Sequence, residues 1–127
     1  MYVNDLAFLN KYSQNLHLIL FADDTAVLQI SQDTNTLNRE MTANLEIVSD
    51  WFASNRLTLN AKKTELLAPG QPPDQTNIIL QGAKVKPMEQ AKYLGVQLDN
   101  CLNYNMHVLQ LTRKLKKVII IYLKLVK

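Results

Sequence analysis

The sequence predicts an α+β fold with a β-hairpin, two helices and shorter strands between them, and three observations support this prediction. Two β-type apolar runs, residues 16–22 and 25–30, are separated by only two acidic residues. Apolar residues at three- and four-residue spacing then predict a helix over about residues 34–55, and a second helix from about residue 103. Shorter strand candidates lie between these helices. At 127 residues the chain has room for about one domain.

The first run, LHLILFA, is almost continuously apolar, which is typical of a strand buried on both faces. The second run begins directly after Asp23 and Asp24. Two strands joined by two turn-prone acids predict a β-hairpin with the Asp-Asp pair at its tip.

The helix over residues 34–55 has a start signal, because Asp33 or Thr34 can cap its first turn. One apolar stripe runs along it, formed by Leu37, Met41, Leu45, Val48 and Phe52, and predicts that the helix packs on a sheet. Trp51 lies beside this stripe. It could stack on a nucleobase, but the helical spacing favours a core aromatic.

The rest of the chain predicts shorter elements. Residues 57–68 form a turn into a short strand ending at Leu66 and Leu67, and PGQPPD at 69–74 forms a loop. Strands are expected at 77–80 and 91–98, joined through Gly82 and Pro87. The C-terminal helix carries more apolar residues than one face needs, so we expect it to pack against something absent from this sequence.

Composition excludes several classes of protein. With 47% apolar and 20% charged residues the chain can form a core. A lone cysteine, Cys101, forbids an intrachain disulfide, and with His17 and His107 it cannot complete a Cys/His zinc cage. The apolar stretch at 118–123 is too short to span a membrane, and the first ten residues lack the basic leader of a secretory signal. We therefore expect an intracellular protein, nuclear or cytoplasmic, that is neither secreted nor bound to a membrane.

The net charge of +3 combines two unlike halves. Residues 1–50 hold seven acids and two bases, a net −5, whereas residues 51–127 hold twelve bases and four acids, a net +8. The C-terminal basic cluster includes Arg113, Lys114, Lys116 and Lys117, with no acid in the last fifteen residues. Such a cluster can bind a nucleic-acid backbone, or it can be the solvated face of a helix.

The Asp23-Asp24 pair is the strongest candidate for chemistry. Neighbouring residues of a regular strand point to opposite faces, so two adjacent carboxylates face one ligand only where the chain turns. Two carboxylates this close keep both charges when a cation neutralises them, and a hard ion such as Mg²⁺ can do so while still binding substrate phosphates. An ordinary solvated turn is the alternative, but the flanking strands are too apolar for one.

Several segments resemble one known family. Residues 2–6 read YVNDL, residues 21–25 read FADDT, residues 51–64 read WFASNRLTLNAKKT, and residues 93–99 read YLGVQLD. In this order they are similar to the Y-[IV]-N-D-L, F-A-D-D-T, LN-x-x-K-T and YLGV-x-LD segments of the reverse transcriptases of non-LTR (LINE-type) retrotransposons. His107 matches a family histidine that follows a tryptophan by three residues, although Tyr104 takes the tryptophan's place here.

The resemblance implies a fold and a function. Residues 1–100 would form part of a polymerase palm, which is ferredoxin-like (RRM-like), and residues 101–127 would begin the thumb helix. The implied activity is RNA-templated DNA synthesis by two-metal nucleotidyl transfer, with Asp23 and Asp24 as ligands of Mg²⁺, or of Mn²⁺ in its place. The implied partners of the full-length parent are an RNA template, a DNA primer and a deoxynucleoside triphosphate.

Three further sites follow from the resemblance. Lys63 is the motif lysine, which would lie near the incoming triphosphate and steady the leaving group; an ordinary surface lysine is the alternative. Tyr93, Leu94 and Gly95 would form a hairpin beside the primer, and a plain buried hairpin is compatible with that role. Arg113, Lys114, Lys116 and Lys117 would contact nucleic acid from the thumb.

The sequence also departs from the family. A third catalytic aspartate and a P-Q-G-S helix, both upstream in family members, are not among these residues. We therefore expect a fragment without fingers and the upstream palm, which would not extend a primer alone. Residues 25–30 and 64–68 would lack a common neighbouring strand, leaving exposed edges. The alternative function is a non-catalytic nucleic-acid-binding or relic fragment that uses the basic C-terminal helix.

Overall fold

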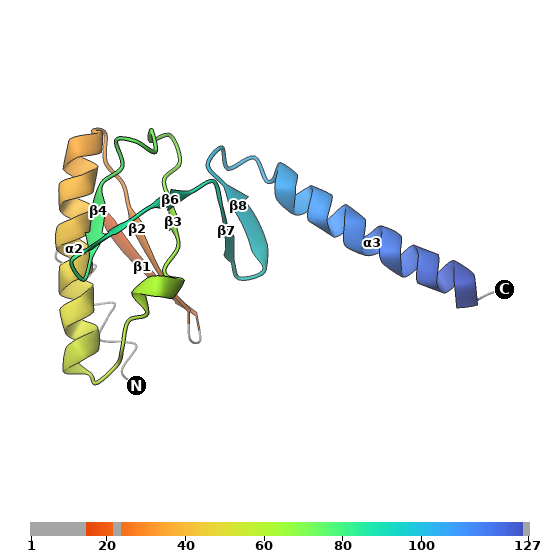
Figure 1. The fold of residues 1–127 in the computed structure, drawn as a ribbon, viewed down its shortest axis with the longest axis horizontal. Helices are drawn as coiled ribbons and strands as arrows, with labels where there is room; N and C mark the ends of the chain where they lie inside the picture. Colours follow the sequence, from red (N-terminus) through yellow and green to blue (C-terminus); the bar gives the residue numbers. More distant parts are fainter. Residues whose placement is uncertain (1–14, 22–23, 126–127) are drawn as a thin grey trace. The chain divides into compact units, whose positions relative to one another are not determined.

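The computed structural model describes residues 15–21 and 24–125, and the side chains only as far as residue 116. The fold is α+β, as the sequence predicts (Figure 1). The chain divides into two compact units, Met1–Thr64 with Gln71–Lys86, and Glu65–Gly70 with Pro87–Lys127.

The first unit is built on the predicted hairpin. Strand β1 (Leu16–Phe21) pairs with the antiparallel strand β2 (Asp24–Gln29), and the last pair before the tip is Phe21 with Asp24. Leu18 and Val27 face each other on the inner side of the hairpin and belong to the core. The sequence therefore predicted the hairpin correctly. Asp24, expected in the turn, is instead the first paired residue of β2, and Asp23 lies outside the described residues.

Helix α2 (Thr34–Ser54) covers the inner side of this hairpin. Asp33 is its N-cap, as predicted: its side chain accepts hydrogen bonds from the backbone N–H groups of Asn35 and Thr36. The buried positions of the helix are Met41, Leu45 and Val48, and all three belong to the predicted stripe. Trp51 packs at the edge of this core, in edge-to-face contact with Phe52. It is therefore a core aromatic.

The expectation that β1 is buried on both faces was wrong. Leu16 and Leu18 are buried, but His17 and Ile19 on the other side of the strand are exposed, and Phe21 retains 62% of its accessible surface. The outer side of β2 is exposed like that of β1, since Leu28 is exposed as well. The reason is that α2 covers only the inner side, and nothing among the described residues covers the outer one.

Polar side chains along one side of α2, a polar row formed by Asn38 and Thr42, bind the β4–β5 hairpin and the residues before it. Strands β4 (Ile78–Leu80) and β5 (Ala83–Val85) form a hairpin whose turn, Gln81-Gly82, has positive φ at both residues. The Oγ1 atom of Thr42 accepts a hydrogen bond from the N–H of Ile79 (3.1 Å), and Asn38 binds both flanking residues, Gln75 and Asn77. Polar side chains of α2 therefore satisfy the outer edge of β4, whose Ile78 and Leu80 fill the core.

The second unit contains the remaining elements. Strand β3 (Leu66–Leu67) pairs in parallel with β6 (Pro87–Met88), and β7 (Gln90–Tyr93) forms an antiparallel hairpin with β8 (Val96–Asp99). Helix α3 (Asn105–Leu125) follows. The short strand at Leu66 and Leu67 was predicted. The single strand expected at 91–98 was wrong, because Leu94 and Gly95 both adopt positive φ and turn the chain back at its middle.

The expected open edges are present. Within the described residues, β2 pairs only with β1, and β3 pairs only with β6. The two strands that were expected to lack a common neighbour therefore lie in separate two-stranded sheets.

Among the described helices, none combines the length and apolar content that crossing a membrane requires.

Candidate functional site

The tip of the β1–β2 hairpin brings a carboxylate to the surface. Asp24 is the first residue of β2 and is exposed. Because directly paired residues share a face, Asp24 lies with Phe21 on the outer side of the hairpin, away from α2. Its carboxylate makes no hydrogen bond to any described residue. Asp23, the other predicted ligand, lies outside the described residues.

The base of the hairpin is fixed to α2. The side chain of Gln29 donates to Glu40 (3.0 Å) and accepts from Asn44 (2.7 Å), so one amide bridges two residues that lie one helical turn apart. Together with the packing of Leu18 against Val48, these bonds set the position of β2 along α2. The tip is therefore carried by a supported pair of strands rather than by a free loop.

Lys63 lies in a capped helical turn. It is the last residue of the 3₁₀ helix η2 (Ala61–Lys63), and its backbone N–H donates to the side-chain Oδ1 of Asn60 at 3.2 Å. The hydroxyl of Thr64 donates to the carbonyl of Asn60 (2.9 Å) and closes the turn. The Lys63 side chain is exposed and forms no ion pair within the part of the chain that the structure describes.

The residue that ties this turn to the hairpin is Leu59. It is partly buried and packs against the cluster of Leu18 and Val48, so the lysine turn and the hairpin share one core. Asp24 and Lys63 consequently belong to the same compact unit. The sequence analysis had not assigned these supporting roles to Leu59 and Asn60. The LN that begins the LN-x-x-K-T segment was the available signal, since Leu supplies the anchor and Asn the cap.

The predicted primer-side residues form a tight turn. Leu94 and Gly95, with φ of 47° and 82°, are the two-residue loop between β7 and β8. Leu94 is exposed at the tip. Next to it, the hydroxyl of Tyr93 is buried and has no hydrogen-bond partner among the described residues. An unpaired buried hydroxyl is costly, so this end of the hairpin carries a polar group that its own unit does not satisfy.

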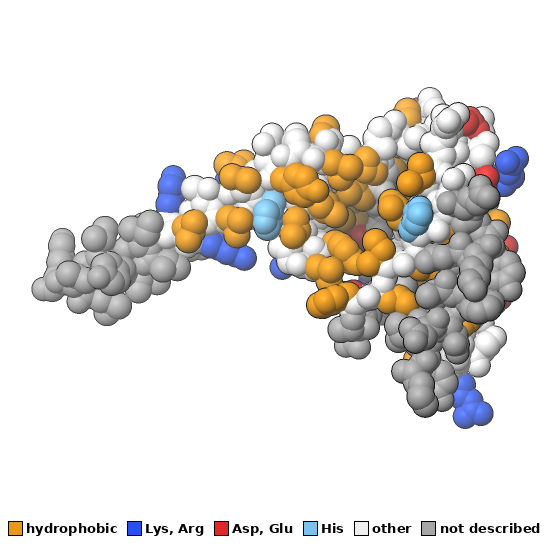
Figure 2. Space-filling model, turned by 180° about the vertical axis from the view of Figure 1, so that it is seen from behind, with side chains coloured by type: hydrophobic (Ala, Val, Ile, Leu, Met, Phe, Trp, Pro, Cys, Tyr) orange, Lys and Arg blue, Asp and Glu red, His pale blue; other side chains and the backbone are white. Residues whose placement is uncertain are grey.

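Helix α3 carries the predicted basic residues. Arg113, Lys114 and Lys116 are exposed, and Figure 2 shows basic side chains in blue along the described part of the helix. The side chain of Lys117 lies outside the described ones. Val108, Leu111 and Leu115 are exposed on the same helix at three- and four-residue spacing. The described part of the helix thus presents both a basic surface and an apolar stripe. The apolar run at 118–126, which carries the excess noted in the sequence, lies outside the described side chains.

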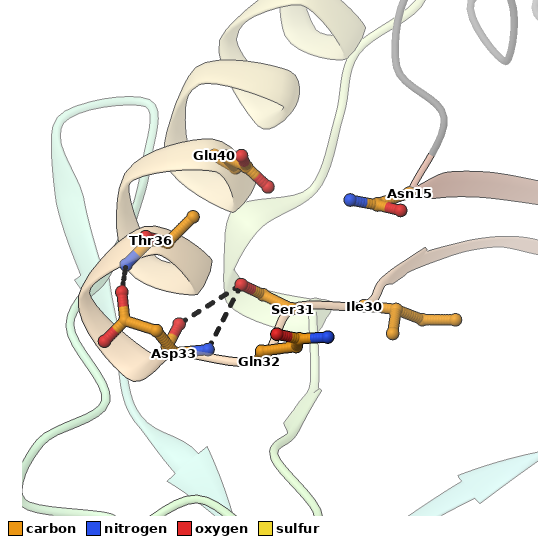
Figure 3. A pocket seen from close by; sticks show the side chains of 7 residues that line it. All are labelled: Asn15, Ile30, Ser31, Gln32, Asp33, Thr36 and Glu40. Atoms are coloured by element: carbon orange, nitrogen blue, oxygen red, sulfur yellow. Dashed lines mark hydrogen bonds between the residues drawn. The ribbon is translucent and has the colours of Figure 1, made fainter.

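A shallow pocket lies at the other end of the hairpin from the Asp-Asp tip (Figure 3). Ile30, Ser31 and Asp33 line it together with Glu40 of α2. Asp33 is engaged in capping, and hydrogen bonds with the side chain and the backbone N–H of Thr36 hold the pKa of its carboxyl below the ordinary value. This pocket is part of the helix cap, and none of the predicted site residues line it.

The described residues permit a test of the predicted metal site. They contain no group of three or more histidine, cysteine or acidic side chains close enough to hold an ion together. The carboxylate of Asp24 nevertheless fits a hard divalent cation, because it is an exposed oxygen donor without a competing partner. Among the described residues, Asp24 is therefore the one candidate ligand at this tip.

Comparison with known proteins gives a consistent result. Residues 1–98 match the family model described as reverse transcriptase (RNA-dependent DNA polymerase). A probable RNA-directed DNA polymerase from transposon BS of Drosophila melanogaster is 32% identical over 104 residues, covering 76% of this chain and 11% of the relative. The chain thus spans about a tenth of the length of that relative. No solved structure matches the chain.

Proposed function

The chain belongs to the reverse transcriptase family, and from this premise we propose that it is the segment of a non-LTR (LINE-type) RNA-directed DNA polymerase that carries the catalytic hairpin. Residues 1–100 would form part of the palm, with a ferredoxin-like arrangement completed by regions outside this segment. Residues 101–127 would begin the thumb. The exposed carboxylate of Asp24, held at the tip of a supported hairpin and free of described partners, carries this proposal.

The proposed role of Asp23 and Asp24 is to hold a divalent cation, Mg²⁺ or Mn²⁺, at the tip. When bound, such a cation lowers the barrier to nucleotidyl transfer by activating the primer hydroxyl and neutralising charge on the triphosphate. The chain's own contribution is placement. Burial of Leu18 of β1 against Val48, and the bonds of Gln29 of β2 to α2, hold the hairpin on the helix, and Asp24 begins β2.

Lys63 is proposed to neutralise the leaving pyrophosphate. Its ammonium is exposed, and the Asn60 cap fixes the backbone from which it projects. A cation held in place before the reaction stabilises charge that develops on the leaving group. The neighbouring Lys62 shares the charge and the turn, so it provides a matched control for this role.

The second unit is proposed to hold the RNA template and the DNA primer. The turn at Tyr93, Leu94 and Gly95 would contact the primer, and Arg113, Lys114, Lys116 and Lys117 would contact phosphates. Several exposed basic side chains on α3, with no acidic residue in the same helix, favour a polyanion as the partner. An intracellular site of action, where the nucleic acid and the nucleoside triphosphates occur, is part of this proposal.

The test is primer extension on a primed RNA template with Mg²⁺, in a polymerase that contains this segment and the upstream palm. Asp24→Asn should reduce extension by at least about a hundred-fold, because stabilisation by a catalytic metal is worth several kcal/mol. Asp33→Asn, the same change at the helix cap, should extend nearly as the parent does. Equal activity of the parent and Asp24→Asn would refute the proposal. The isolated segment, residues 1–127, should show no extension.

A second candidate function is non-catalytic nucleic-acid binding, and the exposed basic side chains of α3 favour it. In that case residues 1–127 should bind RNA or DNA in a salt-dependent manner. Replacing Arg113, Lys114, Lys116 and Lys117 by Ala should remove this binding, and Asp23→Ala should leave it unchanged. Salt-independent binding, or binding that survives the fourfold replacement, would reject this candidate.

A further inference from the structure

A side chain from α3 satisfies the outer edge of the β7–β8 hairpin. Tyr93 and Val96 close the two-residue turn, so the next pair, Lys92 with Gln97, is a pair whose N–H groups point away from the partner strand. Both amides are taken by side chains. The N–H of Lys92 donates to the carboxylate of Glu65 (3.4 Å), and the N–H of Gln97 donates to Nδ1 of His107 (3.2 Å).

The bond to His107 defines the state of its ring. A backbone N–H can only donate, so Nδ1 must carry a lone pair, and the proton of the neutral imidazole is on Nε2. Uptake of a second proton at Nδ1 would convert this acceptor into a donor facing another donor. The hydrogen bond therefore exists only with the neutral ring.

His107 lies in the first turn of α3, where the helix leaves the hairpin. The connecting loop is bent by Leu102 and Tyr104, which adopt positive φ of 51° and 58°. The carboxylate of Asp99 accepts from the N–H groups of Cys101 (2.9 Å) and Asn103. These bonds shape the loop but do not reach the helix. Within the described residues, the bond from Gln97 to His107 is the hydrogen bond that joins α3 to β8.

We propose that His107 is a positioning residue, whose neutral ring fixes the start of α3 against β8 and so holds the basic helix in a set direction from the Tyr93–Gly95 turn. This proposal rests on the proposed function, in which the turn and the helix hold the same primer and template. The titratable groups of the adjoining strand and loop are Asp99 in β8, and Cys101 and Tyr104 in the loop. Protonation of the ring would loosen the helix.

Amide hydrogen exchange of residues 1–127, followed by NMR, tests the contact directly. His107→Leu removes the acceptor at similar volume, whereas His107→Asn keeps an acceptor oxygen near the position of Nδ1 and does not titrate. Exchange at Gln97 should be on the order of three- to ten-fold faster in His107→Leu, the effect of losing one hydrogen bond, and close to the parent in His107→Asn. His17→Leu, at the exposed histidine of β1, is the matched control.

Acidification supplies a second measurement, because a side chain that only packs would not make the exchange protection of Gln97 depend on pH. Protonation of Nδ1 removes the acceptor, so the protection of Gln97, corrected for intrinsic exchange, should fall in the parent on acidification and stay constant in His107→Asn. The amide of Asn100, which bonds to Glu89 across the hairpin, reports whether the hairpin itself remains folded. Unchanged protection in His107→Leu, or no change in the parent on acidification, would overturn the proposal.

Binding of a labelled primer–template duplex by the same proteins tests the consequence. His107→Leu should weaken binding several-fold, and His107→Asn should restore it. If the parent binds the duplex and both variants bind it as tightly as the parent does, the positioning role is wrong. If the parent does not bind, the proposed function fails, and the exchange experiment still decides whether His107 fixes the helix.

Discussion

The core that supports the Asp-Asp tip can be tested at Val48. This residue of α2 is 1% exposed and forms the central cluster with Leu18 of β1. Val48→Ala removes two buried carbon atoms, which costs about 1.6 kcal/mol at ~0.8 kcal/mol for each. An unfilled cavity adds to this cost, and the better helix propensity of Ala returns about 0.5 kcal/mol. We expect a loss of about 1–2.5 kcal/mol in the free energy of unfolding.

The neighbouring residue provides the control. Ile47 is also β-branched and lies in the same helix, but 46% of its surface is exposed. Ile47→Ala should change the free energy of unfolding by no more than about 0.5 kcal/mol, because little surface is uncovered and the helix propensity improves. Urea unfolding followed by circular dichroism measures both values. Equal losses at the two positions would refute the packing of α2 on the hairpin.

Three further outcomes follow from the same structure. The pKa of Asp33 is lower in the folded state than in the unfolded state. Its carboxylate should therefore stabilise the fold at pH values above the unfolded-state pKa, and this stabilisation should disappear as the pH falls through the folded-state pKa. Asp33→Asn can still cap the helix but does not titrate, so its free energy of unfolding in urea should lack this acid dependence. Tyr93→Phe should leave the melting temperature unchanged or raise it, since the lost hydroxyl is buried without a described partner; a clear drop would reveal an unseen partner. The exposed apolar outer side of the β1–β2 hairpin should make the chain self-associate, and replacing Ile19 and Leu28 by Thr should reduce the association measured by analytical ultracentrifugation. Association that the replacement leaves unchanged would contradict a role of this side of the hairpin.

Local patterns in the sequence predicted much of the fold. The hairpin at Asp23-Asp24, the cap at Asp33 and the apolar stripe through Val48 each depend on neighbouring residues, so their spacing was informative. The turn at Leu94-Gly95 was harder to predict from residue patterns. Its first residue is a leucine at positive φ, which turn propensities do not favour, and only the family resemblance indicated a hairpin there.

Burial could not be predicted in the same way. The apolar run at 16–22 indicated a strand covered on both sides, yet Phe21 and Ile19 are exposed because the described residues cover one side only. A continuous apolar run shows that both faces of a strand can be buried, but it does not show whether another element packs on each face. For the same reason the polar row on α2 was missed. Asn38 and Thr42 gave no sequence signal, since their partners are backbone groups about 37 residues away.

The candidate site was predicted as residues rather than as geometry. The sequence identified Asp24 and Lys63, and the structure adds that they belong to one unit tied together by Leu59. Nothing in the residue pattern alone indicated this tie, because a whole helix separates Leu59 in sequence from Leu18, a member of the cluster against which it packs. The acceptor role of His107 was likewise beyond prediction, since it depends on the direction of the Gln97 N–H group.

The central claim is that the tip of the β1–β2 hairpin holds a divalent cation. Mn²⁺ is paramagnetic and broadens the NMR signals of nearby amides, so a titration of residues 1–127 locates the bound ion directly. We predict that Thr25, next to Asp24, broadens first, and that Asp23→Asn and Asp24→Asn each abolish this effect. Broadening that begins instead near Asp33 and Glu40, or that persists in both variants, would contradict a metal site at the tip.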